Sequence, residues 1–558
     1  MPFRRGPEIN PFIGASQEPM VLLESVTPVE LASCVPLVKI TKIDPRTGRP
    51  MDDVRPLMFD LTQGADTTGR KSDFGFDLDR FMERPLISLN SLQVKSDMKY
   101  GFMLFRDVTL EFTVHRPDIV FDRFSPLGWK EILEEGRSFS LEYGWVADPT
   151  LCKNPLFNGI GHVTPSGRVL KSHSTILLVV YRYKVNLTDN GEARVTVEAK
   201  ENSDIALREA RFSDTFERAF GGDPAGDRKN VERLRVLLGG LTQHIQPGRG
   251  VLYEMGEILD SVVAPMIETA TRAFGYAADS PVEMLLANFN SRAGRQSAKF
   301  GGAEMAGKSL GDFMVPADRL RDALSTHFAQ GRSMFLRNFI NILIGIMNEA
   351  DAWGADERQD RQKPEVALKT DTIRTPDGSL RLILMICDRK VSTDVFKEVE
   401  TLPLRSQSRS DVMKALASRD VPVIEFGRAG SAILGASFDM QPDPLLQAIQ
   451  IDEAYRDRKD RVEKSQMPDV ESRQGKAGSK DIVPLSILEG EITMIGNFVV
   501  DTFGTFWIDF FGSSAISGIF NVLEKTDNIE PGKFQSTFKV ISEGIDPLGT
   551  RRRRTSAE

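Results

Sequence analysis

The chain has 558 residues, of which 41% are hydrophobic and 27% are charged, a composition typical of globular proteins large enough to bury several cores. Its 71 Lys and Arg residues against 79 Asp and Glu residues give a formal net charge of −8, which argues against a body built to bind nucleic acid. The first residues lack the apolar core of a signal peptide, and no run reaches the roughly 18 apolar residues of a membrane span. We therefore expect a soluble protein of roughly three or four domains that folds in the cytoplasm.

The cysteines give no sign of a cross-linked or metal-binding protein. Cys34, Cys152 and Cys387 are odd in number, far apart in the sequence and without metal-site spacing. This usage is typical of a reducing compartment. We expect no disulfide, no metal and no cofactor.

The N-terminal part of the chain is expected to be rich in strands. Residues 1–30 show little periodicity and predict an extended arm, whereas residues 31–203 alternate in the two-residue period of strands and predict a barrel-like β domain. Asp189 and Gly191 mark a hairpin turn near its end. The expected strands are 35–44, 85–94, 103–115, 136–145, 175–183 and 185–200.

Residues 136–145 show this alternation most clearly. Phe139, Leu141, Tyr143 and Trp145 occupy every second position, so one face of the strand is expected to be buried. The strand ends on two aromatic residues, which we take as candidates for a core or an interface.

The middle of the chain favours helices. Residues 204–353 carry apolar residues at helical spacing, and Ser280 with Glu283 forms a capping box that predicts a helix start. These features predict a helical domain or a large helical insertion. The segments with helical periodicity are 231–238, 251–274, 316–328 and 333–353.

Strands are expected again in the last third. Residues 354–371 are polar and predict a linker, and the second β-rich domain, 354–451, contains strands at 380–388 and 422–426. The remaining segments are a charged helix and loop at 452–480, a C-terminal β-barrel domain at 481–545 and a basic flexible tail at 546–558 that contains Arg551 to Arg554. The expected fold class is therefore α+β and multidomain, with β-barrel or sandwich domains at both ends and a central helical domain.

One stretch matches a nucleotide-binding pattern. Residues 302–309, from Gly302 to Ser309, read GAEMAGKS and fit the phosphate-binding loop, with Lys308 in the lysine position. Such a loop works between a buried strand and a helix, where backbone N–H groups hold the phosphates. Here a polar stretch precedes it and Pro316 follows after seven residues, so a chance match is favoured.

Hydrolytic chemistry has no visible residue set. The five histidines show no metal-ligand spacing, and no nucleophile elbow occurs. We therefore expect a protein that is not an enzyme.

Four stretches, taken in order, resemble baseplate proteins of contractile-tailed bacteriophages, in particular the tail hub proteins. The first runs from residue 84 to the aromatic-Gly-Trp strand that ends at Trp145. The other three are residues 311–316 with 335–343, residues 430–438, and residues 495–500 with 518–522 and 529–538. Residues 452–480 and the N-terminal arm do not match.

The resemblance implies a structural subunit of the tail, assembled in the host bacterial cytoplasm and carried in the virion. Hub proteins are trimers that join the tail tube to the central spike, so the implied partners are tube, spike and wedge proteins. Three alternatives remain open: a peripheral wedge subunit, a nucleotide-binding enzyme that uses residues 302–309, and a peptidoglycan-degrading hub fusion. The candidate core or interface residues are Phe139, Tyr143, Trp145, Phe498, Trp507, Phe520 and Phe534.

Overall fold

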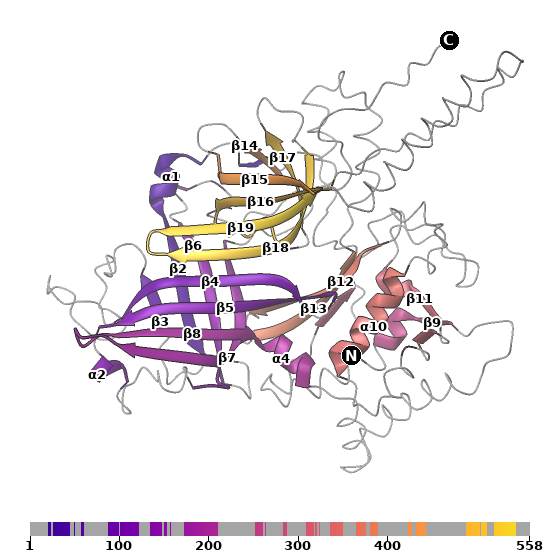
Figure 1. The fold of residues 1–558 in the computed structure, drawn as a ribbon, viewed down its shortest axis with the longest axis horizontal. Coiled ribbons are helices and arrows are strands. Elements are labelled where there is room, and N and C mark those ends of the chain that lie inside the picture. Colours follow the sequence, from indigo (N-terminus) through magenta and orange to yellow (C-terminus); the bar gives the residue numbers. More distant parts are fainter. Residues whose placement is uncertain are drawn as a thin grey trace, which may run out of the picture.

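Most of the described chain is β-sheet in a computed structural model (Figure 1). Its strands form one 17-stranded sheet and a separate two-stranded sheet. The structure describes residues 21–23, 26–44, 49–50, 57–60, 87–99, 101–115, 117–121, 134–147, 150–152, 154, 157, 172–209, 252–259, 263, 283–286, 309–316, 319–320, 323, 335–349, 364–374, 380–388, 422–426, 431–441, 487–502, 504–510 and 518–542.

The N-terminal strands form an antiparallel series. β4 and β5 pair along their whole length, β8 pairs with the other edge of β5, and β7, β6 and β2 follow in that order. The turn between β7 and β8 contains Gly191 at φ +78°, as the turn residues predict. The strands are β1 (Val21–Leu23), β2 (Cys34–Lys42), β3 (Leu57–Asp60), β4 (Ile87–Lys99), β5 (Met103–Val114), β6 (Ser138–Ala147), β7 (His173–Leu187) and β8 (Ala193–Glu201).

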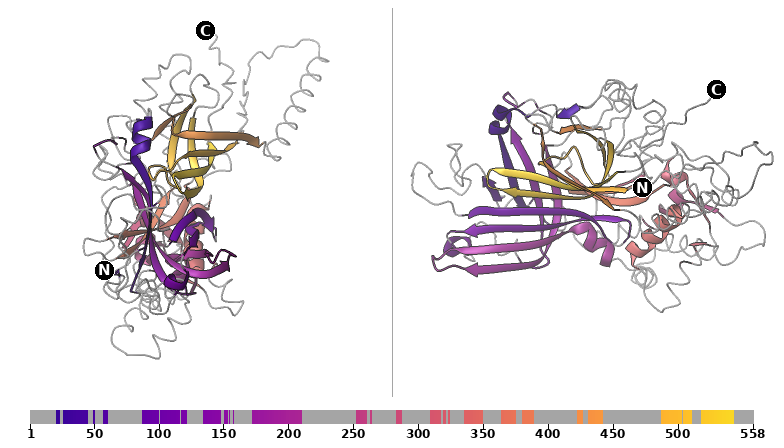
Figure 2. Two further views of the ribbon diagram at one scale, coloured as in Figure 1. Left: turned by 90° about the vertical axis from the view of Figure 1, so that its left-hand side faces the viewer. Right: turned by 45° about the horizontal axis from the view of Figure 1, so that its top comes forward.

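The C-terminal strands pack against this series and are joined to it by strand pairing. β18 pairs with β19 on one side and with β4 on the other. Figure 2 shows β18 and β19, in yellow, running beside the N-terminal strands. The strands are β14 (Val423–Phe426), β15 (Ile433–Gln441), β16 (Ile487–Ile495), β17 (Thr505–Phe510), β18 (Gly518–Glu530) and β19 (Lys533–Ser542).

The prediction of an α+β fold with a central helical domain is wrong. Among the described residues between 204 and 353 the longest helix is α10, with 13 residues, and strands lie beside it. Glu283, expected to start a helix, begins β10, which pairs in parallel with β13. The strands of the middle part are β9 (Leu252–Glu254), β10 (Glu283–Leu286), β11 (Met314–Pro316), β12 (Val366–Arg374) and β13 (Leu380–Asp388).

The helices of the described chain are few and mostly short. α10 is amphipathic and buries Leu336, Phe339, Ile340 and Leu343. No helix of the described residues has the length and hydropathy that crossing a membrane requires. The helices are α1 (Pro28–Ser33), α2 (Pro117–Val120), α4 (Asn202–Glu209), α7 (Met255–Ile258), the 3₁₀ helix η3 (Leu310–Asp312) and α10 (Leu336–Asn348).

The described residues form two hydrophobic clusters. The larger combines side chains of the N-terminal strands with those of the C-terminal strands, so both parts share one core. The smaller joins the start of β5 to α10, η3, β12 and β13. β12 starts at Val366, inside the stretch expected to be a linker.

Several expected features lie outside the described residues. They are residues 1–20 of the arm, the predicted helix 231–238, residues 302–308 of the nucleotide-binding pattern, the charged stretch 452–480 and the tail 546–558.

Candidate functional site

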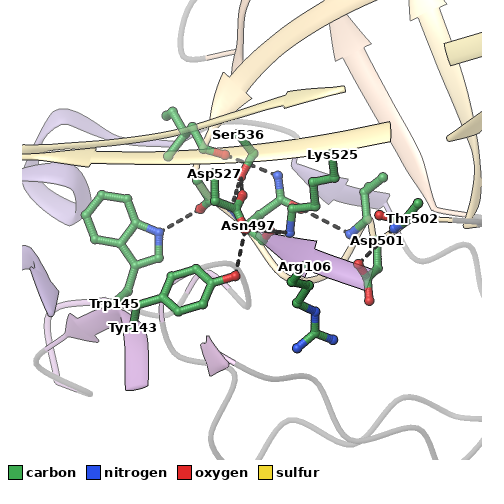
Figure 3. Close-up of polar contacts among 12 residues, drawn as sticks. Arg106, Tyr143, Trp145, Asn497, Asp501, Thr502, Lys525, Asp527 and Ser536 are labelled. Atoms are coloured by element: carbon green, nitrogen blue, oxygen red, sulfur yellow. Dashed lines mark hydrogen bonds and ion pairs between the residues drawn. The ribbon is translucent and has the colours of Figure 1, made fainter. Parts of the chain in front are cut away.

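Tyr143 and Trp145 reach from β6 into the C-terminal strands (Figure 3). The Tyr143 hydroxyl donates a hydrogen bond to Asp527 Oδ2 at 3.0 Å, and Trp145 Nε1 donates to the carbonyl oxygen of Gly496 at 2.6 Å. Both side chains are buried. Because residues two apart on a strand share a face, β6 makes both contacts from one side.

Aromatic rings surround these two hydrogen bonds. The Trp145 ring centroid lies 5.2 Å from that of Phe157 and 5.3 Å from that of Phe534, and Tyr143 lies 5.3 Å from Phe498. A Cβ atom at Gly496 would come within 2.3 Å of the Phe534 ring. The close approach at this point therefore requires glycine.

Asp527 is the buried carboxylate that receives Tyr143. Its Oδ1 accepts from the Ser536 hydroxyl at 2.5 Å, and Lys525 Nζ lies 3.3 Å from Oδ2. Burial raises the pKa of Asp527, and the charge of Lys525 opposes this shift in part. Burial and the neighbouring Asp527 also raise the pKa of Tyr143, so the phenol keeps its proton.

Lys525 and Asn497 fix the segment that follows β16. Lys525 Nζ donates to the backbone carbonyl of Asn497 at 2.7 Å and lies 4.9 Å from the Phe498 ring centroid. The Asn497 side chain accepts from the Val500 N–H and donates to the carbonyl of Ile495. The carbonyl that Trp145 contacts, that of Gly496, lies within this segment.

A second polar group joins β5, β8 and β12. Arg106 Nη2 lies 3.2 Å from Asp371 Oδ1, and the Arg106 backbone N–H donates to Glu201 Oε2 at 3.1 Å. Glu201 Oε1 accepts from the Thr370 hydroxyl at 2.8 Å. Burial raises the pKa of Glu201, against the effect of Arg106. Burial disfavours the charged form of Arg106, but Glu201 and Asp371 outweigh it and raise the pKa of Arg106.

Asp501 connects the two polar groups. It forms an ion pair with Lys369 on β12, and its Oδ1 accepts from the Thr502 N–H. Burial opposes the charge of Asp501, but Lys369, Lys525 and Arg106 together lower its pKa. The two polar groups and Asp501 form one network, which we call the junction network. It consists of Arg106, Tyr143, Glu201, Lys369, Thr370, Asp371, Asn497, Asp501, Lys525, Asp527 and Ser536.

The junction network is arranged to hold strands together. A carboxyl group with a raised pKa in a cleft is a candidate acid or base. Here both oxygens of Asp527 and both oxygens of Glu201 already accept hydrogen bonds, and each residue is at most 2% exposed. No group of three His, Cys, Asp or Glu side chains in the described part is placed to hold a metal ion. The geometry therefore supports a fixed relation between the two strand series.

The surface has a different feature, the open edge of β7. β6 pairs with β7 as far as Val179, and the Val180 backbone still exchanges hydrogen bonds with Gly136 and Arg137. From Tyr181 to Leu187, β8 is the only described strand that pairs with β7. Tyr183, Val185 and Leu187 lie opposite the buried Val197, Val195 and Ala193 of β8. They are 44%, 38% and 75% exposed. The apolar face of the sheet thus continues onto an exposed strand segment, the β7 edge (residues 181–187).

The structure brings four of the seven candidate residues together. Tyr143, Trp145, Phe498 and Phe534 form the aromatic cluster described above. Phe520 is buried beside Phe438 and Phe506, in another part of the C-terminal strands. Phe139 is buried in the larger cluster, and Trp507 is half-buried on β17.

The sequence interpretation missed the polar members of the junction network. One signal was present in β18, where Lys525, Asp527 and Ile529 occupy successive inward-facing positions of the strand. Charged residues at apolar positions of a strand indicate buried, paired groups.

The chain after the nucleotide-binding pattern does not have the structure that a phosphate-binding loop requires. Ser309 caps η3, a 3₁₀ helix of three residues, and its side chain accepts from the Gly311 N–H. β11 follows directly and pairs with β9. A phosphate-binding loop needs an α-helix at this point, since the helix N-terminus contributes to binding the phosphates.

Comparisons with known proteins give only distant likenesses. No family model matches the sequence, and no curated protein matches it. Among solved structures, a tail protein from Neisseria meningitidis is 8% identical, with a TM-score of 0.30, over 82% of this chain and 94% of that one. A 43 kDa tail protein of a Shewanella oneidensis prophage is 8% identical, with a TM-score of 0.31, over 82% and 95%.

A third similar structure is a Francisella PdpA–VgrG complex. The identity is 9% and the TM-score 0.34, over 91% of this chain and 58% of that one, so the chain spans little more than half of its length. The similar structures are thus two tail proteins, one of them from a prophage, and a VgrG complex. Identities and TM-scores this low do not by themselves establish a shared fold.

Proposed function

We propose that the chain is a structural subunit of a contractile phage tail baseplate and acts as the hub that joins the tail tube to the central spike. The observation that carries the proposal is the β7 edge, an exposed strand whose apolar face continues the buried face of its sheet. An open edge of this kind pairs with a strand of a neighbouring subunit.

The junction network suits a protein that transmits force. A hydrogen bond ties β6 to β18, an ion pair ties β12 to Asp501 in the segment between β16 and β17, and a second ion pair ties β5 to β12. Buried, paired groups of this kind tolerate only a narrow range of geometries, because separating them leaves a charge buried without a partner. The two strand series would therefore move as one body.

The order of motifs supports the same role. The aromatic strand ending at Trp145 and the closing strands at residues 518–538 resemble the corresponding parts of tail hub proteins. We place the chain in the virion as a homotrimer, in contact with tube, spike and wedge proteins, after assembly in the host cytoplasm. Its division into β-rich N-terminal and C-terminal domains belongs to this proposal.

Co-purification with candidate partners tests the proposal. The purified chain, mixed with tail-tube protein and with spike protein in separate experiments, is expected to elute with each as a stable complex. A chain that stays monomeric and binds wedge proteins instead would be a peripheral subunit. A chain that binds neither tube nor spike would contradict the hub assignment.

A further inference from the structure

Two cysteines that are 118 positions apart meet in the core. Cys34 begins β2, and Cys152 follows the end of β6. Their sulfur atoms lie 3.5 Å apart, and both are free thiols. Cys34 is 8% exposed and Cys152 is fully buried. Sequence spacing gave no reason to pair them.

We infer that Cys34 and Cys152 are a redox-sensitive pair that closes to an intramolecular disulfide when a low-molecular-weight disulfide reaches it. A disulfide has a sulfur–sulfur distance of about 2.05 Å, so each side chain has less than 1 Å to move. Cys34 lies opposite Ala147 of β6, five residues before Cys152. The bond would therefore tie the start of β2 to the chain that leaves β6.

The chemistry balances as two successive exchanges. One cysteine thiolate attacks a sulfur of the reagent, which forms a mixed disulfide and releases one reagent thiol. The second cysteine loses its proton and attacks the protein sulfur of the mixed disulfide, which releases the second reagent thiol. The two cysteines are oxidised, and the reagent disulfide is reduced to two thiols.

The surroundings make this reaction slow in the closed structure. Burial, together with the neighbouring Cys152, raises the pKa of Cys34 to about 12. Burial also raises the pKa of Cys152, although hydrogen bonds from Cys34 and the Asn154 backbone oppose the shift. Since the thiolate is the reactive species, the raised pKa values of both thiols slow the first attack.

The helix α1 adjoins the pair: it ends at Ser33, whose hydroxyl oxygen lies 3.9 Å from Cys34 Sγ. None of the α1 side chains is buried, and Val29 is 65% exposed. Its start is held by a capping box in which Thr27 and Glu30 exchange hydrogen bonds. A short helix held in this way opens locally more readily than the sheet, which lets the reagent approach the two sulfurs.

The proposed function suggests what the disulfide would do in the particle, and only this step rests on that proposal. A tail subunit is made in a reducing cytoplasm and then released into an oxidising medium. The pair would stay reduced during assembly and close in the released particle. The cross-link would then fix the strand β6 that carries Tyr143 and Trp145.

The test uses the purified full-length chain and oxidised glutathione. Free thiols are counted in denaturant before and after incubation, and non-reducing peptide maps identify the linked residues. The wild type is expected to fall from three free thiols to one, with a Cys34–Cys152 peptide two hydrogens lighter than the reduced pair. The melting temperature of the oxidised chain is expected to rise on the order of 5 °C, since the closed loop is long.

Variants supply the controls. Cys387→Ser is expected to fall from two thiols to none, whereas Cys34→Ser and Cys152→Ser form no intramolecular bond. Thr27→Ala is expected to speed closure about fivefold, as loss of a helix cap favours local opening. Three thiols remaining in the wild type, a glutathione adduct that never closes, or a bond to Cys387 would overturn the inference. None of these results depends on trimer formation or on binding to tail proteins.

Discussion

The hydroxyl of Tyr143 on β6 donates a 3.0 Å hydrogen bond to Asp527 on β18, across 384 positions of sequence. Both residues are buried, so the bond is made away from water. Through it the strand that closes the first matching stretch of the sequence is connected to the strands of the last one. Three of the predictions below test how firmly this connection holds.

Removing the hydroxyl should weaken the folded state measurably. Tyr143→Phe leaves Asp527 Oδ2 with Lys525 as its remaining partner, and we expect a loss of about 1–3 kcal/mol in the free energy of unfolding. Urea unfolding followed by fluorescence measures it. Tyr183→Phe, at an exposed position on β7, is the matched control and should change stability by less than about 0.5 kcal/mol. Equal effects of the two changes would contradict the role of the bond.

Trp145 should matter both for its ring and for its N–H group. Trp145→Ala removes the ring from the cluster with Phe157 and Phe534 and is expected to cost about 3–5 kcal/mol. Trp145→Phe keeps much of the packing but leaves the Gly496 carbonyl without its donor, so the expected loss is smaller, about 1–3 kcal/mol. Thermal unfolding of both variants measures the difference. If Trp145→Ala kept full stability and abolished binding of a tail protein, the residue would belong to an interface.

The close approach at Gly496 should tolerate no side chain. A Cβ atom there would meet the Phe534 ring at 2.3 Å, so Gly496→Ala is expected to destabilise by about 1–3 kcal/mol. Gly435→Ala on β15 is the control, because no atom lies within 4 Å of its added Cβ. Chemical denaturation of the two variants in parallel provides the comparison. A loss of stability no larger than that of the control would show that the ring moves aside freely.

The lowered pKa of Asp501 predicts that the folded state loses stability in acid. Its pKa is lowered in the folded state, so it stabilises the fold above the unfolded value of about 3.9 and loses this contribution as the pH falls below that value. Glu201 and Asp527 act with the opposite sign. Their pKa values are raised, so the folded state takes up their protons first and gains stability relative to the unfolded chain as the pH falls.

The variant Asp501→Asn separates the contribution of Asp501 from that of Glu201 and Asp527. It should lower the melting temperature at pH 7, because Lys369 loses its counter-charge, and it should flatten the loss below about pH 4. The Asp501 side chain is 35% exposed, so solvent screening limits the size of the effect. Asp189→Asn, in the exposed turn after β7, is the control. An acid profile that Asp501→Asn leaves unchanged would show that other carboxylates dominate.

The strands with one apolar face were predictable from the sequence. β5 was expected at 103–115 and is found at Met103–Val114, because its alternating side chains pack on one core. β12 was missed: Lys369 and Thr370 lie in the stretch predicted to be a linker, yet they are buried. Lys369 and Thr370 have partners far away in the sequence, Asp501 and Glu201, which periodicity does not reveal.

The helical prediction failed where short apolar runs were ambiguous. Residues 283–286 follow a capping-box pattern, but they form a strand beside β13, where parallel pairing outweighs the local signal. α10 does follow its helical periodicity. The junction network could not be predicted from the sequence for a related reason. The residues around Tyr143 predicted a buried face of β6, but Asp527, the partner of Tyr143, lies on a strand that no local pattern connects to β6.

The β7 edge should control assembly and leave folding intact. Tyr183 and Val185 are exposed, so replacing both with Lys is expected to change stability by less than about 0.5 kcal/mol per site. The charges would keep a neighbouring strand from pairing, as lysines do on natural edge strands. Circular dichroism and thermal unfolding check that the variant folds. Val29→Lys, on the exposed face of α1, is the matched control.

The mass in solution tests the central claim most directly. Sedimentation equilibrium of the wild type and of Val29→Lys is expected to give three copies of the 62.1 kDa chain, and the Tyr183→Lys, Val185→Lys variant one copy. A wild type that remains a single chain at all concentrations, or a double variant that still forms the trimer, would contradict assembly through the β7 edge.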